Sequence, residues 1–579
     1  MHTPTRSPNR FRLAPTACAV ALSCLTLACT PHPATRNTAP QPTVESEANP
    51  GSAVRPALAE HAVAPAQADV LTDVLTSTHA ATALPQSKRA TFANVVTDWP
   101  VLPHAPTASG DIYHGAEANP ITRTANQPVS TFGLDVDSGS YAVVRRHLAH
   151  GQLPPAAAVR TEELINYFDY RSTTRGAEAT DTPFVLSTEL ATAPWHPDRY
   201  LLRIGVDAAR APQSTLPPAN LVFLIDVSGS MHDADKLPLL QSAMRLLTRQ
   251  LDGEDRVSIV TYAGHAAVVL EPTAGDDTRA IESAITALSA GGSTHGAAGL
   301  RDAYRLAESA FIDGGINRVM LATDGDFNVG ETDHDALVAL IEAKRGTGIA
   351  LSTMGLGQGN YNDHLMEQLA DHGNGNYAYI DSMREASRVL ETELGATLHT
   401  VAHDAKIQVE FNPATVAEYR LIGYENRALR EQDFDNDRVD AGDIGAGHSV
   451  TALYELALVG SAGTQLPARR FAPTPSTHPD VHALAEISLR YKRTTDAASE
   501  RLSRLITVDD TEDTTSASLR FAASVAAWGD WLRDSGARPA FGPAAIRDLA
   551  HSALGDDRGG YRREFLELVD LASAIKGRS

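Results

Sequence analysis

Cysteine is almost absent from this chain of 579 residues, because Cys18, Cys24 and Cys29 lie near the N-terminus and no other thiol follows. The rest of the chain therefore has no disulfide, no cysteine ligand for zinc and no cysteine nucleophile. Positive charge is also scarce: 49 Lys and Arg residues stand against 71 Asp and Glu residues, for a formal charge of −22. Such a surface repels nucleic acid and anionic lipid, so we expect no nucleic-acid partner.

Long apolar runs are missing after the first 28 residues. Near the start, a charge-free stretch from Leu13 to Ala28 follows Arg6, Arg10 and Arg12. This stretch is too short to span a bilayer comfortably, but it matches the apolar region of a secretory signal. We therefore expect residues 1–29 to be an export signal that is cleaved.

The end of this signal, Leu25-Thr-Leu-Ala-Cys29, resembles a bacterial lipobox. That resemblance implies lipidation at Cys29, and Thr30 in place of Asp implies delivery to the outer membrane of a diderm bacterium. The alternative is an ordinary signal peptide whose cysteines are incidental. The expected location is thus outside the cytoplasm, on a membrane that the chain contacts through its N-terminal lipid.

The length predicts three or four folded units. After the signal, a stretch rich in Ala, Pro and Thr has the composition of a disordered tether. The predicted parts are a tether at 30–126, an N-terminal module (helical, then β) at 127–217, a central domain at 218–398, and a C-terminal module at 399–579 that is β-rich to about 495 and helical from about 516.

The central domain alternates short apolar runs with amphipathic helical patterns, which indicates a doubly wound, mostly parallel sheet of the α/β class with helices on both faces. Continuous apolar runs are typical of strands that are buried on both faces. The predicted strands are Asn220–Asp226, Arg256–Tyr262, Arg318–Asp324, Ile349–Gly355 and Tyr377–Asp381, and the predicted helices are Leu237–Leu251, Asp277–Leu288, Ala297–Ala310, Asp333–Lys344, His364–Asp371 and Arg384–Leu398.

Oxygen-bearing side chains follow three of these segments. Asp226, Ser228 and Ser230 come from one tight loop, Thr294 lies in a glycine-rich loop that opens a helix, and Asp324 ends another strand. The carboxyl ends of parallel strands meet at one edge of a sheet, where such folds bind ligands. Five hard oxygen donors at one edge suit a divalent cation, Mg²⁺ first, with Mn²⁺ or Ca²⁺ as alternatives.

These five residues resemble the metal-ion-dependent adhesion site of a von Willebrand factor type A domain. The resemblance implies that Ser228, Ser230 and, in the ligand-bound state, Thr294 contact the metal directly, whereas Asp226 and Asp324 reach it through water. It also implies that a partner supplies a carboxylate to the remaining coordination position, and we expect a protein partner that presents an Asp or Glu. Because the sequence offers no organised base or nucleophile beside this site, we expect a binding module rather than an enzyme.

The flanks are similar to the bacterial YfbK-like family of such lipoproteins. The N-terminal similarity is carried by Ser130-Thr-Phe-Gly-Leu-Asp-Val-Asp137 and Glu162-Glu-Leu-Ile-Asn-Tyr-Phe168, and the C-terminal similarity by Lys406-Ile-Gln-Val-Glu-Phe-Asn412 and Arg520-Phe-Ala-Ala-Ser-Val-Ala-Ala527. Alternating strand patterns occur on both sides of the central domain. One sandwich built from both flanks would explain them, and two unrelated sandwiches are the alternative.

Three further patterns in the sequence give weaker evidence for a functional site. The acidic run Asp433 to Asp443 lacks the glycine and the final glutamate of a calcium loop, so we interpret it as a solvated turn. Asp135-Val-Asp137-Ser-Gly-Ser140 echoes the metal loop, and we interpret it as a strand end. His295 would be the base of a metal-dependent hydrolase, which is the enzymatic alternative to a binding protein; a structural envelope protein is the third possibility.

Overall fold

The computed structural model describes residues 110–171, 182–210, 216–293, 296–325, 327, 334–439, 441–467, 469, 482–512, 514–538 and 540–578. The signal, Cys29, Thr294 and His295 lie outside these residues. Residues 110–126, which composition assigns to the tether, belong instead to the folded part. Within them, the short strand β1 (Thr122–Arg123) pairs with β12 (Val416–Ile422).

The central sheet has six strands in the order β10-β9-β8-β5-β6-β7. All neighbours are parallel except β6 and β7, which are antiparallel. The predicted parallel sheet is therefore confirmed, and the edge strand β7 is an addition to it. The bounds are β5 Ala219–Asp226, β6 Arg256–Tyr262, β7 Ala266–Ala274, β8 Ile316–Thr323, β9 Ala350–Leu356 and β10 Tyr377–Ile380.

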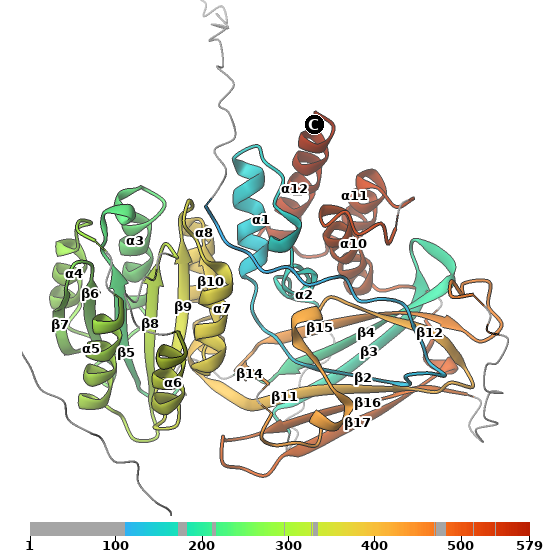
Figure 1. Cartoon of the computed structure of the whole chain (residues 1–579), viewed down its shortest axis with the longest axis horizontal. Helices are drawn as coiled ribbons and strands as arrows, with labels where there is room; N and C mark the ends of the chain where they lie inside the picture. Colours follow the sequence, from blue (N-terminus) through green and yellow to red (C-terminus); the bar gives the residue numbers. More distant parts are fainter. Residues whose placement is uncertain are drawn as a thin grey trace, which may run out of the picture. The chain divides into compact units, whose positions relative to one another are not determined.

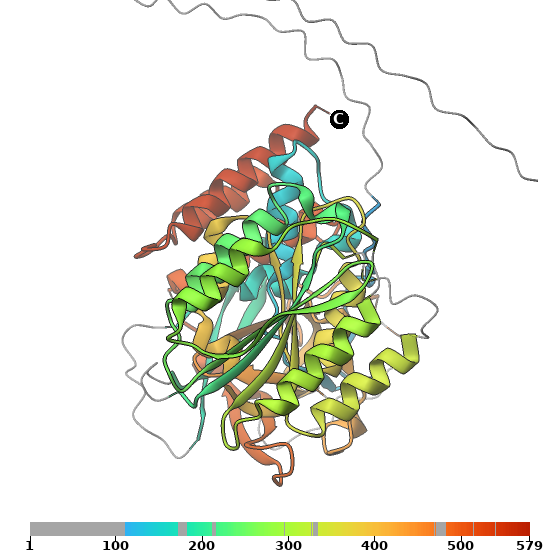
Figure 2. The same ribbon diagram turned by 90° about the vertical axis from the view of Figure 1, so that its left-hand side faces the viewer.

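Helices cover both faces of this sheet, as Figure 2 shows. Alternate residues of β5 point to opposite faces, so Phe223 packs in the core beneath α3 and α4, and Leu224 packs in the core beneath α5 and α6. Both side chains are almost fully buried. The helices are α3 Leu237–Thr248, α4 Thr278–Ala287, α5 Gly296–Ser309, α6 His334–Arg345, α7 Asp363–His372, α8 Met383–Ser387 and α9 Leu394–Leu398, with a π-helical turn at Arg388–Thr392 between the last two.

Strands from both flanks of the central domain form one sandwich (Figure 1). One sheet has the order β1-β12-β15-β4-β3, and the other has the order β13-β2-β11-β16-β17, with β14 paired to β11. Phe132 and Phe184 from the N-terminal side share a buried core with Ile407 and Tyr454 from the C-terminal side. Further bounds are β2 Val129–Gly133, β3 Phe184–Ala193, β4 His196–Ala208, β11 Thr400–Phe411, β13 Ala428–Leu429, β14 Gly442–Gly445, β15 Ser449–Leu458, β16 Ala483–Lys492 and β17 Glu500–Thr507.

A helical cluster also combines the two flanks. Tyr141 and Phe168 of the N-terminal module pack with Phe521, Trp528 and Phe565 of the C-terminal module, and several of these rings meet edge to face. Among the described helices, none is both long and apolar enough to cross a membrane. The helices of the cluster are α1 Gly139–Ala149, α2 Thr161–Asn166, α10 Ala517–Leu532, α11 Pro543–His551 and α12 Tyr561–Lys576.

Candidate metal site

Four of the five predicted metal ligands lie in the described part of the chain, and they gather at the carboxyl edge of the central sheet. Asp226 is the last residue of β5, and Asp324 directly follows the adjacent parallel strand β8. Ser228 and Ser230 lie in the turn that leaves β5, where a short 3₁₀ helix spans Gly229–His232. The topology thus brings together two carboxylates and two hydroxyls from neighbouring strand ends.

The turn after β5 holds its two hydroxyls close to each other. The Oγ atoms of Ser228 and Ser230 lie 3.0 Å apart. The backbone N–H of Ser228 donates to Asp226 Oδ1 at 2.8 Å, and the hydroxyl of Thr323 donates to Asp226 Oδ2 at 3.0 Å. These bonds orient the carboxylate of Asp226 beside the paired hydroxyls, in an arrangement that suits an oxygen-coordinated cation.

The glycine-rich loop that leads to Thr294 lies against this turn. Gly229 N–H donates to Gly292 O at 3.0 Å, and Gly291 N–H donates to Val227 O at 2.7 Å. Gly292 has a φ of +95°, a conformation that glycine adopts without strain. Thr294 is two residues beyond this contact, and its place relative to Ser228 lies outside what the structure describes.

Both carboxylates at this edge of the sheet are buried, which makes their negative charge costly. Asp226 is fully buried and Asp324 is 1% exposed. Burial raises the pKa of Asp226 to about 6, the nearby charge of Asp324 raises it further, and the bonds from Ser228 and Thr323 oppose the rise. A bound cation would compensate both carboxylates, so the charge and the hard-oxygen donor set of the described residues fit a divalent metal.

Lys236 also enters this site, and sequence analysis did not identify it. Its Nζ donates to Asp324 Oδ2 at 3.0 Å, and its side chain is only 7% exposed. The ammonium group thus places a positive charge on one of the two candidate acidic ligands. The only signal in the sequence was a basic residue shortly after the serine turn, and such a residue is common at the start of a helix.

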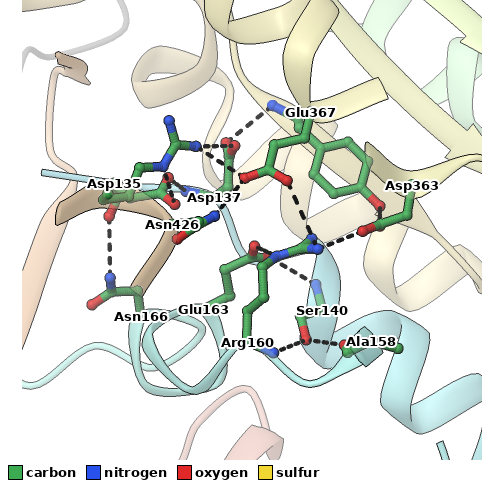
Figure 3. Close-up of polar contacts among 12 residues, drawn as sticks. Asp135, Asp137, Ser140, Ala158, Arg160, Glu163, Asn166, Asp363, Glu367 and Asn426 are labelled. Atoms are coloured by element: carbon green, nitrogen blue, oxygen red, sulfur yellow. Dashed lines mark hydrogen bonds and ion pairs between the residues drawn. The ribbon is translucent and has the colours of Figure 1, made fainter. Parts of the chain in front are cut away.

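A second acidic cluster lies elsewhere, where Asp135, Glu163 and Glu367 bring carboxylate oxygens within 4.8 Å of one another (Figure 3). Two arginines share it. Arg160 pairs with Glu163 and Asp363, while Arg427 contacts Asp135 at 3.2 Å and Glu367 at 3.3 Å. The cluster joins the N-terminal module to α7 of the central domain and to the loop after β12, and we interpret it as a structural joint.

The motif Asp135 to Ser140 contributes to this joint and differs from the serine turn of the central sheet. It begins two residues after β2 ends at Gly133, in keeping with a strand end. Its hydroxyls are committed to separate partners: Ser140 donates to Ala158 O at 2.6 Å, and Ser138 accepts from Arg388 at 2.6 Å. Unlike Ser228 and Ser230, they do not converge with a carboxylate.

The described acidic side chains between Asp433 and Asp443 do not gather at one point either. Asp433 pairs with Arg430, Asp435 and Asp437 both pair with Arg490, and Asp443 lies beside His403. Asp440 lies outside the described residues. The described carboxylates therefore contact three separate basic residues rather than forming one calcium loop.

Comparison with known proteins adds family information to this geometry. A von Willebrand factor type A domain model matches residues 221–326, a von Willebrand factor model matches 107–203, and the model of the C-terminal domain of the uncharacterized protein YfbK matches 396–575. Type A domains are typically interaction modules rather than enzymes. The matches together touch all three parts of the described fold.

The proteins to which the chain is similar include the following two curated proteins and two solved structures. It is 44% identical to the uncharacterized protein YfbK of Escherichia coli over 80% of this chain and 81% of that protein. It is 30% identical to the uncharacterized protein sll0103 of Synechocystis over 32% of this chain and 43% of that protein. A von Willebrand factor type A structure from Catenulispora acidiphila has 16% identity and a TM-score of 0.38, covering 68% of this chain and 92% of its own. The ArnB paralog VWA2 from Sulfolobus acidocaldarius has 14% identity and a TM-score of 0.36, covering 68% and 98%.

Proposed function

This chain belongs to the family of the uncharacterized protein YfbK, and we propose that its type A domain holds a protein partner through a divalent cation. The proposed ligands are Asp226, Ser228, Ser230, Thr294 and Asp324. Mg²⁺ is the proposed metal, and the partner supplies an Asp or Glu carboxylate. The observation that carries the proposal is the pairing of the Ser228 and Ser230 hydroxyls, 3.0 Å apart, beside the buried carboxylate of Asp226.

The chemistry of these donors favours a carboxylate as the partner's group. A cation held mainly by hydroxyls and water keeps much of its charge, and an anionic oxygen is the strongest ligand available to it. When bound, the metal would supply the Lewis-acidic charge that holds the partner. The chain's own residues would orient that charge: Thr323 fixes Asp226, and the backbone of Ser228 fixes it from the other side.

Calorimetric titration with Mg²⁺ and Mn²⁺ tests the metal. The double variant Ser228→Ala with Ser230→Ala should lose measurable binding and keep its melting temperature within a few degrees, because both hydroxyls lie in a turn outside the apolar core. The matched control is Ser242→Ala, whose hydroxyl bonds only within α3, to Pro238 O at 3.0 Å. Unchanged metal affinity in the double variant would reject the assignment.

Capture of the partner tests the second half of the proposal. Wild-type protein immobilised in Mg²⁺ should retain an envelope protein that EDTA releases and that the double variant does not retain. Because the chain has a net charge of −22, long-range attraction of an acidic partner is weak. Retention should therefore depend on metal far more than on salt, and retention in EDTA would show that the partner uses another surface.

We also propose that a lipid on Cys29 anchors the chain to a membrane, the outer membrane of a diderm bacterium. The support is the lipobox-like sequence before Cys29. Cys29→Ser should move the protein to the soluble fraction, whereas Cys24→Ser should not. A membrane-bound Cys29→Ser variant, together with a wild type that carries no acyl mass, would contradict the anchor.

A further inference from the structure

Lys236 stands in an unusual place for a lysine, since long charged side chains are rarely buried without a specific partner. It directly precedes α3, and its backbone accepts the first helical bond from Leu240. Its side chain turns inward and places Nζ 3.0 Å from Asp324 Oδ2. Both groups are more than nine-tenths buried, so water screens this charge pair only weakly.

The stem of Lys236 lies on Gly357, in the loop that follows β9. Gly357 has a φ of +63°, and a Cβ at this position would lie 2.2 Å from Lys236 Cε. Only a glycine therefore leaves room for the lysine to reach Asp324 along this path. The loop continues the carboxyl edge of the sheet, where the candidate metal ligands gather.

The N-terminal module fixes this loop. Arg146 of α1 donates to Gly357 O at 2.7 Å, and Tyr379 of β10 donates to the same oxygen. Arg146 is itself held by Asp111, with Nη2 2.7 Å from Oδ2. A chain of contacts thus runs from Asp111 through Arg146 and Gly357 to Lys236, and it ends on a candidate metal ligand.

A count of the formal charges in the metal-loaded site indicates what Lys236 does there. The formal charges of Asp226 and Asp324 together equal that of a divalent cation, so although hydroxyls and water leave the cation's own charge locally effective, the loaded site without Lys236 would carry no net positive charge. The ammonium group of Lys236 leaves the loaded site with one positive charge, which one carboxylate from a partner neutralises. The exposed Asp233 nearby lies in water, where its charge is screened.

We propose that Lys236 is the specificity-determining residue of the metal site, which selects a carboxylate over a neutral amide oxygen. The inference rests on the proposed function and deepens it. The lysine repels the metal and attracts the partner's carboxylate, so removal of its charge should change the two affinities in opposite directions. A lysine that served only to stabilise the fold would not do this.

The test compares Lys236→Met and Lys236→Gln with wild type in two measurements. Calorimetry with Mn²⁺ should show metal affinity that rises about tenfold in both variants, because the competing positive charge is gone. Acetate is the probe for the second measurement, in which its displacement of water from protein-bound Mn²⁺ is followed by water-proton relaxation. Acetate affinity should fall about tenfold in both variants, and acetamide affinity should change much less.

Two controls separate charge from packing. Lys236→Arg keeps the charge, so its acetate affinity should stay within a few-fold of the wild-type value. Lys344→Met removes one lysine from the same domain, where it pairs with Glu308 on the surface, and should change neither affinity. Melting curves of metal-free protein identify any variant that does not fold.

The outcomes distinguish this inference from the function on which it rests. If wild type binds no metal, the proposed function and the inference both fail. If wild type binds metal and acetate but the Lys236→Met and Lys236→Gln variants behave like it, only the inference fails. A fall of both affinities in variants that fold would assign Lys236 a purely structural role and overturn the inference as well.

Discussion

Arg145 donates two parallel hydrogen bonds to Asp381, from Nε to Oδ2 at 2.7 Å and from Nη2 to Oδ1 at 2.5 Å. The arginine belongs to α1, and the aspartate follows the edge strand β10 of the central sheet. The same guanidinium group also reaches Glu385 at 2.8 Å and Glu564 of α12 at 3.0 Å. One buried side chain therefore joins the N-terminal module, the type A domain and the C-terminal helices.

Arg145→Met should destabilise the protein by about 3 to 5 kcal/mol, since it leaves buried carboxylates without their counter-charge. Chemical denaturation followed by tryptophan fluorescence measures the change. Arg547→Met is the matched control, because its ion pair with Asp570 is exposed and should contribute less than about 1 kcal/mol. Equal losses in the two variants would contradict a special role for the buried pair.

The acidic joint at Glu163 should make stability depend on pH. Burial raises the pKa of Glu163 to about 7, with Arg160 opposing the rise and the nearby Asp135 reinforcing it. A glutamate in the unfolded chain titrates near pH 4.3, so the folded state holds the extra proton between these values. The contribution of Glu163 to stability is therefore present below about pH 4.3 and is lost as the pH rises toward 7.

Glu163→Gln removes this titration and leaves Arg160 paired with Asp363. Relative to the variant, wild type should lose stability from pH 4.5 to 7, with a slope of at most about 1.4 kcal/mol per pH unit. Denaturant midpoints at several pH values measure the difference. The exposed Glu410→Gln is the control, and a pH-independent difference between wild type and Glu163→Gln would contradict the prediction.

Gly357→Ala should displace Lys236 from Asp324 although the lysine remains in the sequence. We expect a stability loss of about 1 to 2 kcal/mol from the positive φ, and Mn²⁺ affinity that rises as in Lys236→Met. Gly314→Ala is the control, because Gly314 has a similar φ of +69° and nothing within 4 Å of the added Cβ. Calorimetry on both variants measures their Mn²⁺ affinities. Identical affinities would show that the contact between Gly357 and Lys236 does not affect metal binding.

The parallel strands of the central sheet were predictable from sequence, because burial on both faces requires continuous apolar runs such as Leu221 to Ile225. The edge strand β7 was not predicted: its short apolar run, Ala266 to Leu270, is only half-buried and stops at Glu271 and Pro272. The predicted helix Arg384–Leu398 is divided by a π-helical turn, where Arg388 pairs with Glu385 and Glu393. Contacts of that kind depend on the tertiary fold rather than on a local pattern.

The same difference between local patterns and tertiary contacts explains which site residues could be predicted. Asp226, Ser228 and Ser230 were recognisable because one short turn carries them all. Lys236 was not recognisable, since its side chain reaches Asp324 by passing over Gly357, which lies far away in the sequence. The joint around Glu163 could not be predicted either, because its members are distant in the sequence and meet only in the tertiary fold.

Because β2 pairs with β11, the parts of the chain can complete their folds only in a certain order during synthesis. A ribosome releases β2 long before β11, with the whole type A domain between them. That domain contains every strand of its own sheet, from β5 to β10, and can close as soon as it emerges. The sandwich stays incomplete until β16 and β17 are made, so the type A domain, which is proposed to bind, is complete before the sandwich is. Truncation before Ala483 would leave the edge of β11 that pairs with β16 exposed.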